Sequence, residues 1–180
     1  MIPLYILGLL LRYGPQHGYQ LKKTISEELE DFTQIKLPSI YYHLEGMAKN
    51  GLLSASSEKP DSRPEKTVYA VTEKGKKAFN GMLQKQLAAQ YRPVFDNDAI
   101  FYFSNELQME DVIGALKEEQ RVLSVSLSTI ERHRLETISF VPPEAKTMVE
   151  IIFSHHELHY RAELDWVEQS LERLRGEKSI

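Results

Sequence analysis

The first 91 residues alternate apolar and turn-forming segments in an order that few small folds accommodate. Apolar residues recur at helical spacing in three short stretches, and Gly14-Pro15 separates the first from the second. Two β-type runs then flank a polar tip, which is typical of a hairpin. The expected elements are helices at about 3–13, 18–29 and 38–50, strands at 52–57 and 67–71, and a helix from 72 towards 91.

Turn and cap residues set the expected ends of these helices. The third helix begins either with Ser39 as N-cap or with Pro38 in its first turn, and Gly51 after Asn50 is a natural stop. Thr72 is the expected N-cap of the fourth helix.

Three helices, a hairpin and a helix form the layout of a winged helix-turn-helix, whose third helix can enter the DNA major groove. Ile40, Leu44 and Met47 share one face of that helix and are expected in the core. The opposite face presents Ser39, Tyr42, His43, Gly46 and Lys49, with Tyr41 near the border. These side chains can donate to phosphates or base edges. The alternative is an ordinary solvated helix face.

Basic residues elsewhere fit the same interpretation. Lys59, Arg63 and Lys66 belong to the hairpin tip, from which a side chain reaches a flanking phosphate or the minor groove. Tyr19, Lys22 and Lys23 on the second helix are placed to contact the DNA backbone.

The second half is expected to be helical throughout, with helices at about 96–103, 110–138 and 144–174 separated by turns and Pro142-Pro143. We therefore divide the chain into a winged-helix domain, 1–92, and a long-helix domain, 93–180. The last helix carries an apolar stripe close to a heptad seam, which requires a partner helix. We predict that it forms a homodimer; the alternative is an antiparallel hairpin within one chain. The stripe consists of Val149, Phe153, Tyr160, Leu164, Val167, Leu171 and Leu174.

The formal charge divides between these halves. The whole chain has a net charge of −4. Residues 1–86 contain 12 Lys/Arg and 9 Asp/Glu, a net of +3, whereas residues 87–180 contain 10 and 17, a net of −7. The acidic total therefore does not argue against nucleic-acid binding by the first half.

Several function classes are excluded. The chain has no cysteine, so thiol catalysis, disulfides and zinc–thiolate sites are absent. Its longest apolar run is much shorter than a membrane span and lacks the features of a signal peptide. No phosphate loop, nucleophile elbow or dinucleotide fingerprint occurs. We expect a cytoplasmic protein that is not an enzyme and uses no cofactor.

Trp166 and two histidines form the second candidate site. Trp166 follows His155 and His159 along one helical face, where an aromatic ring beside imidazoles suits a pocket for a small aromatic effector. The alternative is interhelix packing. The run from His155 to His159 does not match a zincin motif. With His155 as the first histidine, Glu157 comes one place too late; with His156 as the first, Tyr160 stands where the second histidine is needed. No metal site is predicted. A competing hypothesis is a metal- or ligand-binding helical dimer whose winged domain mediates protein contacts.

Five separated motifs resemble PadR-type transcriptional regulators in their order and spacing over about residues 3–83. They are Ile6-Leu7-Gly8-Leu9-Leu10, His17-Gly18-Tyr19-Gln20-Leu21, Pro38-Ser39-Ile40-Tyr41-Tyr42-His43-Leu44, Lys49-Asn50-Gly51-Leu52-Leu53 and Tyr69-Ala70-Val71-Thr72-Glu73-Lys74-Gly75. The remainder resembles the helical C-terminal domain of larger PadR-like proteins and related virulence activators.

The resemblance implies a homodimeric regulator of double-stranded DNA, usually a repressor, that binds a palindromic operator and is sometimes released by a small molecule. Carried over by motif, the DNA-contacting residues are Tyr19, Ser39, Tyr41, Tyr42, Lys59, Arg63 and Lys66. Two positions depart from the family pattern. Ser62 replaces the glycine of a Gly-Arg-Pro wing, and His43 stands where a small residue is common.

Overall fold

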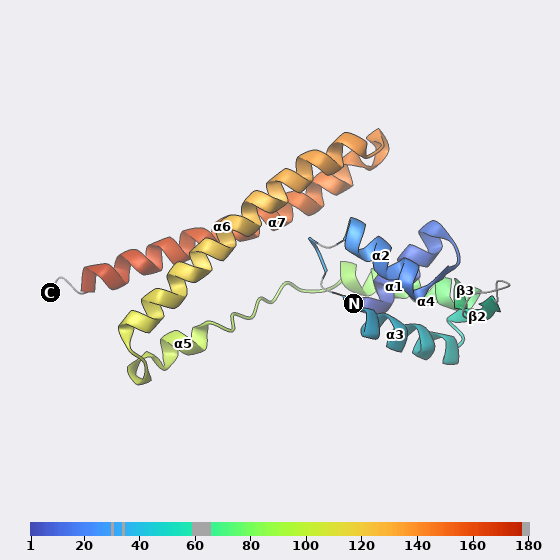
Figure 1. The fold of residues 1–180 in the computed structure, drawn as a ribbon, viewed down its shortest axis with the longest axis horizontal. Coiled ribbons are helices and arrows are strands. Elements are labelled where there is room, and N and C mark those ends of the chain that lie inside the picture. Colours follow the sequence, from blue (N-terminus) through green and yellow to red (C-terminus); the bar gives the residue numbers. More distant parts are fainter. Residues whose placement is uncertain (30, 34, 59–65, 178–180) are drawn as a thin grey trace. The chain divides into compact units, whose positions relative to one another are not determined.

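The chain folds into two compact units, Met1–Arg92 (unit 1) and Pro93–Ile180 (unit 2), each with its own core. A computed structural model describes residues 1–29, 31–33, 35–58 and 66–177. The described residues are mainly helical, and their one small sheet belongs to unit 1 (Figure 1).

Unit 1 has the predicted winged helix-turn-helix order. The helices are α1 (Ile2–Tyr13), α2 (Gly18–Glu28), α3 (Leu37–Lys49) and α4 (Glu73–Leu87), and the strands are β1 (Gln16–His17), β2 (Leu53–Glu58) and β3 (Lys66–Val71). Helix α4 ends at Leu87 and does not continue to Tyr91 as the sequence suggested.

The sheet has three strands, one more than predicted. Strands β2 and β3 pair antiparallel, with Leu53 opposite Val71. The short β1 pairs with the other edge of β3 and places Gln16 opposite Tyr69 and His17 opposite Val68, so the order is β1-β3-β2. Two residues are too few to show the alternation that identifies a strand in a sequence.

The core of unit 1 lies between α1, α2, α3 and the sheet. Its fully buried side chains are aliphatic, and each contributes about 1.5–3 kcal/mol through burial. They are Ile6, Leu7, Leu21, Ile25, Ile40 and Leu44. Met47 is also buried, so the predicted core face of α3 is confirmed.

The ends of α3 and α4 are fixed by local contacts. Helix α3 begins with Pro38 in its first turn, and its N-cap residue, Lys36, makes no side-chain cap; the alternative of Ser39 as N-cap is therefore wrong. Gly51 follows α3 with φ +71°, where a side chain would be strained. Thr72 caps α4 as predicted, because its Oγ1 accepts a hydrogen bond from the Gly75 amide at 3.1 Å.

Unit 2 is built on two long helices, α6 (Met109–Phe140) and α7 (Pro143–Glu177), which lie side by side in opposite directions (Figure 1). They are preceded by the short α5 (Asp98–Tyr102) and a 3₁₀ turn, Ser104–Glu106. Val112 and Leu116 from α6 and Val167 and Leu171 from α7 form the buried core of the hairpin.

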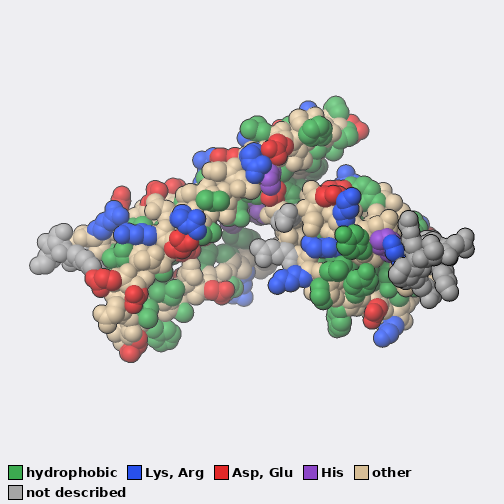
Figure 2. Space-filling model, in the orientation of Figure 1, with side chains coloured by type: hydrophobic (Ala, Val, Ile, Leu, Met, Phe, Trp, Pro, Cys, Tyr) green, Lys and Arg blue, Asp and Glu red, His purple; other side chains and the backbone are tan. Residues whose placement is uncertain are grey.

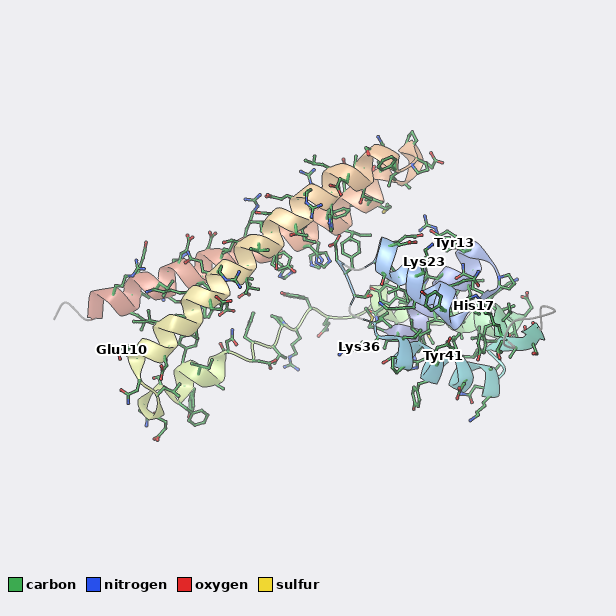
Figure 3. The ribbon with its side chains drawn as sticks, viewed as in Figure 1. Tyr13, His17, Lys23, Lys36, Tyr41 and Glu110 are labelled. Atoms are coloured by element: carbon green, nitrogen blue, oxygen red, sulfur yellow. The ribbon has the colours of Figure 1, made fainter. Side chains whose placement is uncertain are left out.

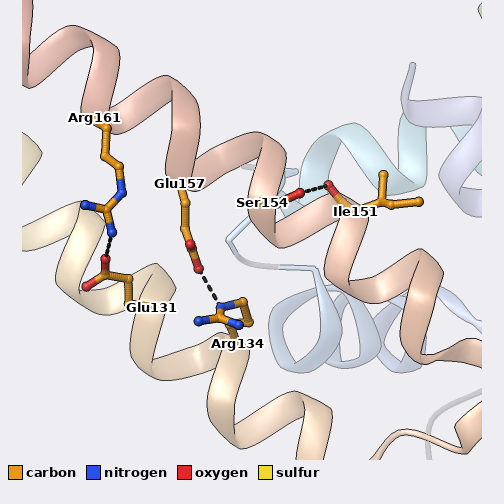
Figure 4. Close-up of polar contacts among 6 residues, drawn as sticks. All are labelled: Glu131, Arg134, Ile151, Ser154, Glu157 and Arg161. Carbon is orange, nitrogen blue, oxygen red and sulfur yellow. Dashed lines mark hydrogen bonds and ion pairs between the residues drawn. The ribbon is translucent and has the colours of Figure 1, made fainter.

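Polar contacts add to the α6–α7 interface (Figure 4). Arg134 Nε donates to Glu157 Oε1 at 2.7 Å, and Arg161 pairs with Glu131 one turn of helix away. Gln120 donates to Glu168 at 3.1 Å nearer the other end. The carboxylate of Glu157 is only 16% exposed, which makes its pairing with Arg134 the better shielded of these contacts.

Three residues of the predicted dimerisation stripe of α7 are buried within a single chain. Phe153, Val167 and Leu171 are 2%, 0% and 3% exposed within a single chain. Val167 and Leu171 pack against Val112 and Leu116 of α6. Val149, Tyr160, Leu164 and Leu174 are half-buried. Within the described residues, no helix combines the length and the apolarity that a membrane span requires.

Candidate nucleic-acid interface

Helix α3 exposes a polar and aromatic face opposite its buried stripe. Tyr42 is 75% exposed and Tyr41 40% exposed, and Lys49 lies exposed at the last turn. Ser39 and His43 are half-buried, and the His43 ring packs edge-on against Tyr42 with centroids 5.2 Å apart. The face thus offers hydroxyl, imidazole and ammonium groups on a rigid helix.

His17 caps the start of α2, a role that its place in the His17–Leu21 motif did not predict. His17 Nδ1 accepts a hydrogen bond from the Gln20 amide at 3.3 Å, and Gln20 Oε1 accepts one from the His17 amide at 3.1 Å. This reciprocal pair is a capping box and satisfies two amides that a helix start leaves unpaired. Tyr19, between the two partners, remains 64% exposed.

Three predicted DNA-contacting residues, each from a different element, line one hollow of about 380 Å³. Tyr19 from α2, Tyr41 from α3 and Lys66 from β3 all line it; Figure 3 labels Tyr41 and His17. The complete lining is His17, Tyr19, Tyr41, Glu45, Lys66, Thr67 and Tyr69. Burial first, and then the charges of Glu45 and Tyr41, raise the pKa of Tyr69, whose phenol therefore stays a neutral hydrogen-bond donor.

Lys22 and Lys23, the other predicted DNA contacts on α2, do not line this hollow. Lys22 is half-buried, and its Nζ donates to Ser26 Oγ at 2.8 Å along α2. Lys23 lies 3.7 Å from Glu27 in an exposed ion pair. Lys59 and Arg63 lie outside the described residues.

Two further lysines lie at the ends of α3 and were not predicted as contacts. Lys36 is exposed immediately before α3 (Figure 3). It was not predicted because α3 begins at Leu37, one residue earlier than expected. Lys74 Nζ donates to the Asn50 carbonyl at 2.8 Å and so fixes the end of α3 against α4. A lysine three positions after a strand carries no signal of such a contact in the sequence.

The three residues predicted to form an effector pocket do not line one pocket in unit 2. Trp166 lines a pocket of about 650 Å³ together with Ala162 and the segment 94–98. His155 and His159 do not line it, because they precede Trp166 by two to three turns of α7. Their rings are 4.7 Å apart. Across the part of the chain that the structure describes, no three His, Cys, Asp or Glu side chains group as metal ligands would.

Residues 6–81 match the family model described as "Transcriptional regulator PadR-like family". Among curated proteins, no match to the chain was found.

Solved structures show the same fold along almost the whole chain. Bacillus subtilis PadR in complex with operator DNA is 21% identical, with a TM-score of 0.72 over 96% of this chain and 98% of that one. The same protein in complex with p-coumaric acid is 19% identical, with a TM-score of 0.71 over 97% and 99%. The Vibrio cholerae virulence activator AphA is 19% identical, with a TM-score of 0.74 over 98% and 99%.

Proposed function

We propose that this chain is a member of the PadR-like family of transcriptional regulators, whose model its residues 6–81 match, and that it represses transcription by binding operator DNA through unit 1. The observation that carries the proposal is the convergence of Tyr19, Tyr41 and Lys66 on one hollow beside the exposed face of α3. A DNA-bound structure exists for the similarly folded Bacillus subtilis PadR. The description of the family model as a transcriptional regulator supports a regulator rather than an enzyme.

The proposed contacts divide by the part of DNA that they reach. Helix α3 enters the major groove, which admits one α-helix, and Ser39, Tyr42 and His43 face the base edges. Phosphates are contacted by a second group, which fixes register without reading sequence. This group comprises Tyr19, Lys22, Tyr41, Lys49, Lys59, Arg63 and Lys66, with Lys36 added from the structure.

We propose that the protein binds a palindromic operator as a homodimer formed by unit 2. With Phe153, Val167 and Leu171 used inside one chain, the partner must cover another face. Exposed apolar side chains follow helical spacing on α7 at Met148, Ile151, Ile152 and Leu158, the last 67% exposed. Figure 2 shows hydrophobic side chains reaching the surface of unit 2 among charged ones. A two-fold dimer spaces two α3 helices about one DNA turn, roughly 34–36 Å, apart.

A small-molecule effector in unit 2 would release the protein from its operator in the cytoplasm. It does so only if it binds the DNA-free arrangement better than the DNA-bound one. The p-coumaric acid complex of Bacillus subtilis PadR supports the idea that a protein of this fold accommodates a small aromatic ligand.

Gel-shift titration with DNA from upstream of the gene tests the function. We expect specific binding that weakens steeply as salt rises, because phosphate contacts release counterions. The exposed Tyr42→Ala should lower affinity, and Tyr102→Ala, equally exposed in unit 2, should not. Absence of specific binding to any operator-length DNA at low salt would overturn the proposal.

Light scattering tests the dimer separately. Ile151→Glu with Leu158→Glu should yield a monomer that keeps its helical content, since both side chains are exposed in one chain. Val125→Glu on α6, also exposed, serves as a control outside the α7 stripe. A dimer unaffected by the α7 changes would place the interface elsewhere.

A further inference from the structure

The pocket of unit 2 lies between the segment 94–98, α6 and α7. Its volume of about 650 Å³ is in the range of pockets that hold drug-sized ligands. Every side chain that lines it belongs to unit 2, so the pocket exists within that unit alone.

One wall of the pocket is aromatic. Trp166 is 37% exposed, and Phe101 supports its ring edge-on, with centroids 5.6 Å apart and planes at 89°. Phe95, which is 54% exposed, lines the pocket from the connecting segment. A planar ring can stack on such a wall without displacing any core side chain.

The rest of the lining sets the sign of the ligand charge. Four carboxylates, from Asp96, Asp98, Glu119 and Glu163, line the pocket, whereas no lysine or arginine does. In the described part of the chain, none of the four forms an ion pair. The Asn97 amide donates to Glu119 at 2.9 Å, which is a neutral partner.

The two glutamates interact unfavourably with each other. Partial burial and the charge of Glu163 together raise the pKa of Glu119, against the opposing hydrogen bond from Asn97. A cation placed between them would relieve this repulsion and gain charge-assisted hydrogen bonds. It would share the pocket with the rings of Trp166 and Phe95, to which a cation is attracted by cation–π interaction when it lies over a ring face.

We propose that this pocket binds a small aromatic amine in its protonated form, with the ring against Trp166 and Phe95 and the ammonium group near Glu119 and Glu163. The proposal names the effector class of the regulator proposed above and rests on that function only for its effect on DNA. An aromatic carboxylate is excluded from the pocket by the same four carboxylates.

The position of the pocket suggests how ligand binding in unit 2 affects unit 1. The wall formed by residues 94–98 directly follows the unit boundary at Arg92–Pro93, and Asn97 within it is hydrogen-bonded to Glu119. A cation that attracts Glu119 competes with the Asn97 contact. Ligand binding therefore acts on the segment through which the two units are joined.

Trp166 is the only tryptophan of the chain and reports on the pocket directly. Three probes share a phenol ring and differ in charge: tyramine is a cation, 4-ethylphenol is neutral, and 3-(4-hydroxyphenyl)propionate is an anion. Tryptophan emission, excited where phenols do not absorb, and calorimetry give their affinities for the full chain without DNA. We expect tyramine to bind about tenfold or more tightly than 4-ethylphenol, and the anion not to bind.

Charge variants then locate the site. Glu119→Gln with Glu163→Gln should abolish the preference for tyramine over 4-ethylphenol, whereas Glu172→Gln, exposed on α7 outside the pocket, should preserve it. Circular dichroism checks that each variant is folded. Equal binding of the three probes, preference for the anion, no response at all, or a preference unaffected by the double substitution would each overturn the proposal.

The effect on DNA is measured in a separate arm. Tyramine should weaken operator binding by the wild type and leave binding by the double variant unchanged. DNA binding without ligand tests the regulator function, and probe binding without DNA tests the pocket, so either can fail alone. Probe binding that leaves operator affinity unaltered would overturn the effector role.

Discussion

The ring of Tyr41 on α3 lies directly against Gly18, the first residue of α2. A Cβ atom built at position 18 would sit 2.6 Å from the ring edge, closer than side chains pack. The contact fixes how near the start of α2 approaches the exposed face of α3, and both neighbours of Gly18, His17 and Tyr19, line the same hollow as Tyr41.

Gly18→Ala should therefore displace the Tyr41 ring. We expect a loss of about 1 kcal/mol in the free energy of unfolding, because the ring can rotate outward, and a clear loss of operator affinity. Urea denaturation and gel shift measure the two effects. In a Gly18→Ala/Tyr41→Ala double variant the stability costs should be less than additive. Full additivity would show that the contact is not the cause.

Gly75→Ala should be more damaging, because the obstacle is backbone. An added Cβ would overlap the Leu52 carbonyl oxygen and lie 2.8 Å from Val71 Cγ1. We expect a loss of about 2 kcal/mol in the free energy of unfolding. Gly81→Ala, in the same helix with open space around it, should instead stabilise by about 0.5–1 kcal/mol. Similar effects of the two substitutions would contradict the close approach of α4 to Leu52.

Lys66→Ala should weaken binding to all DNA sequences alike. If Lys66 contacts a phosphate, the slope of log affinity against log salt should become shallower by about 1. Lys117→Ala, exposed on α6, provides the control and should leave the slope unchanged. A sequence-dependent loss with an unaltered slope would reassign Lys66 to base contact.

Glu119→Gln should make the ligand-free protein more stable at neutral pH. Because the pKa of Glu119 is raised, the folded protein binds a proton there more readily than the unfolded chain does. The contribution of Glu119 to the free energy of unfolding therefore falls as pH rises from the ordinary carboxyl pKa through the raised one. The amide variant removes that dependence. The Tm of the variant should exceed that of the wild type at pH 7, and the difference should shrink towards acid pH. A difference in Tm that does not change with pH would show that the ionisation of Glu119 is not its cause.

The Arg134–Glu157 contact should couple α6 and α7 measurably. A double-mutant cycle with alanine should give about 1 kcal/mol, since the pair is partly shielded from water. The exposed pair Arg132–Glu136, within α6, should give about 0.3–0.5 kcal/mol. Equal couplings for the two pairs would remove any special role for the interhelix contact.

The buried face of α3 was predictable because Ile40, Leu44 and Met47 keep the helical period, and Thr72 because a cap precedes its helix directly in sequence. The partner of the α7 stripe was not predictable, since Val167 packs equally well against α6 or a second chain. The pocket at Trp166 depends on residues 94–98 folding back onto unit 2, a contact between segments about 70 residues apart that no local pattern encodes.

The two-residue strand β1 has a consequence for any signal that reaches unit 1. His17 pairs with Val68 in the central strand and, with the same residue, caps α2. Strand β3 and the start of α2 are therefore anchored by the same residue. For the regulator proposed above, we predict that an effector displaces the β2–β3 hairpin and α2 together, so that release from DNA removes the contacts of both at once.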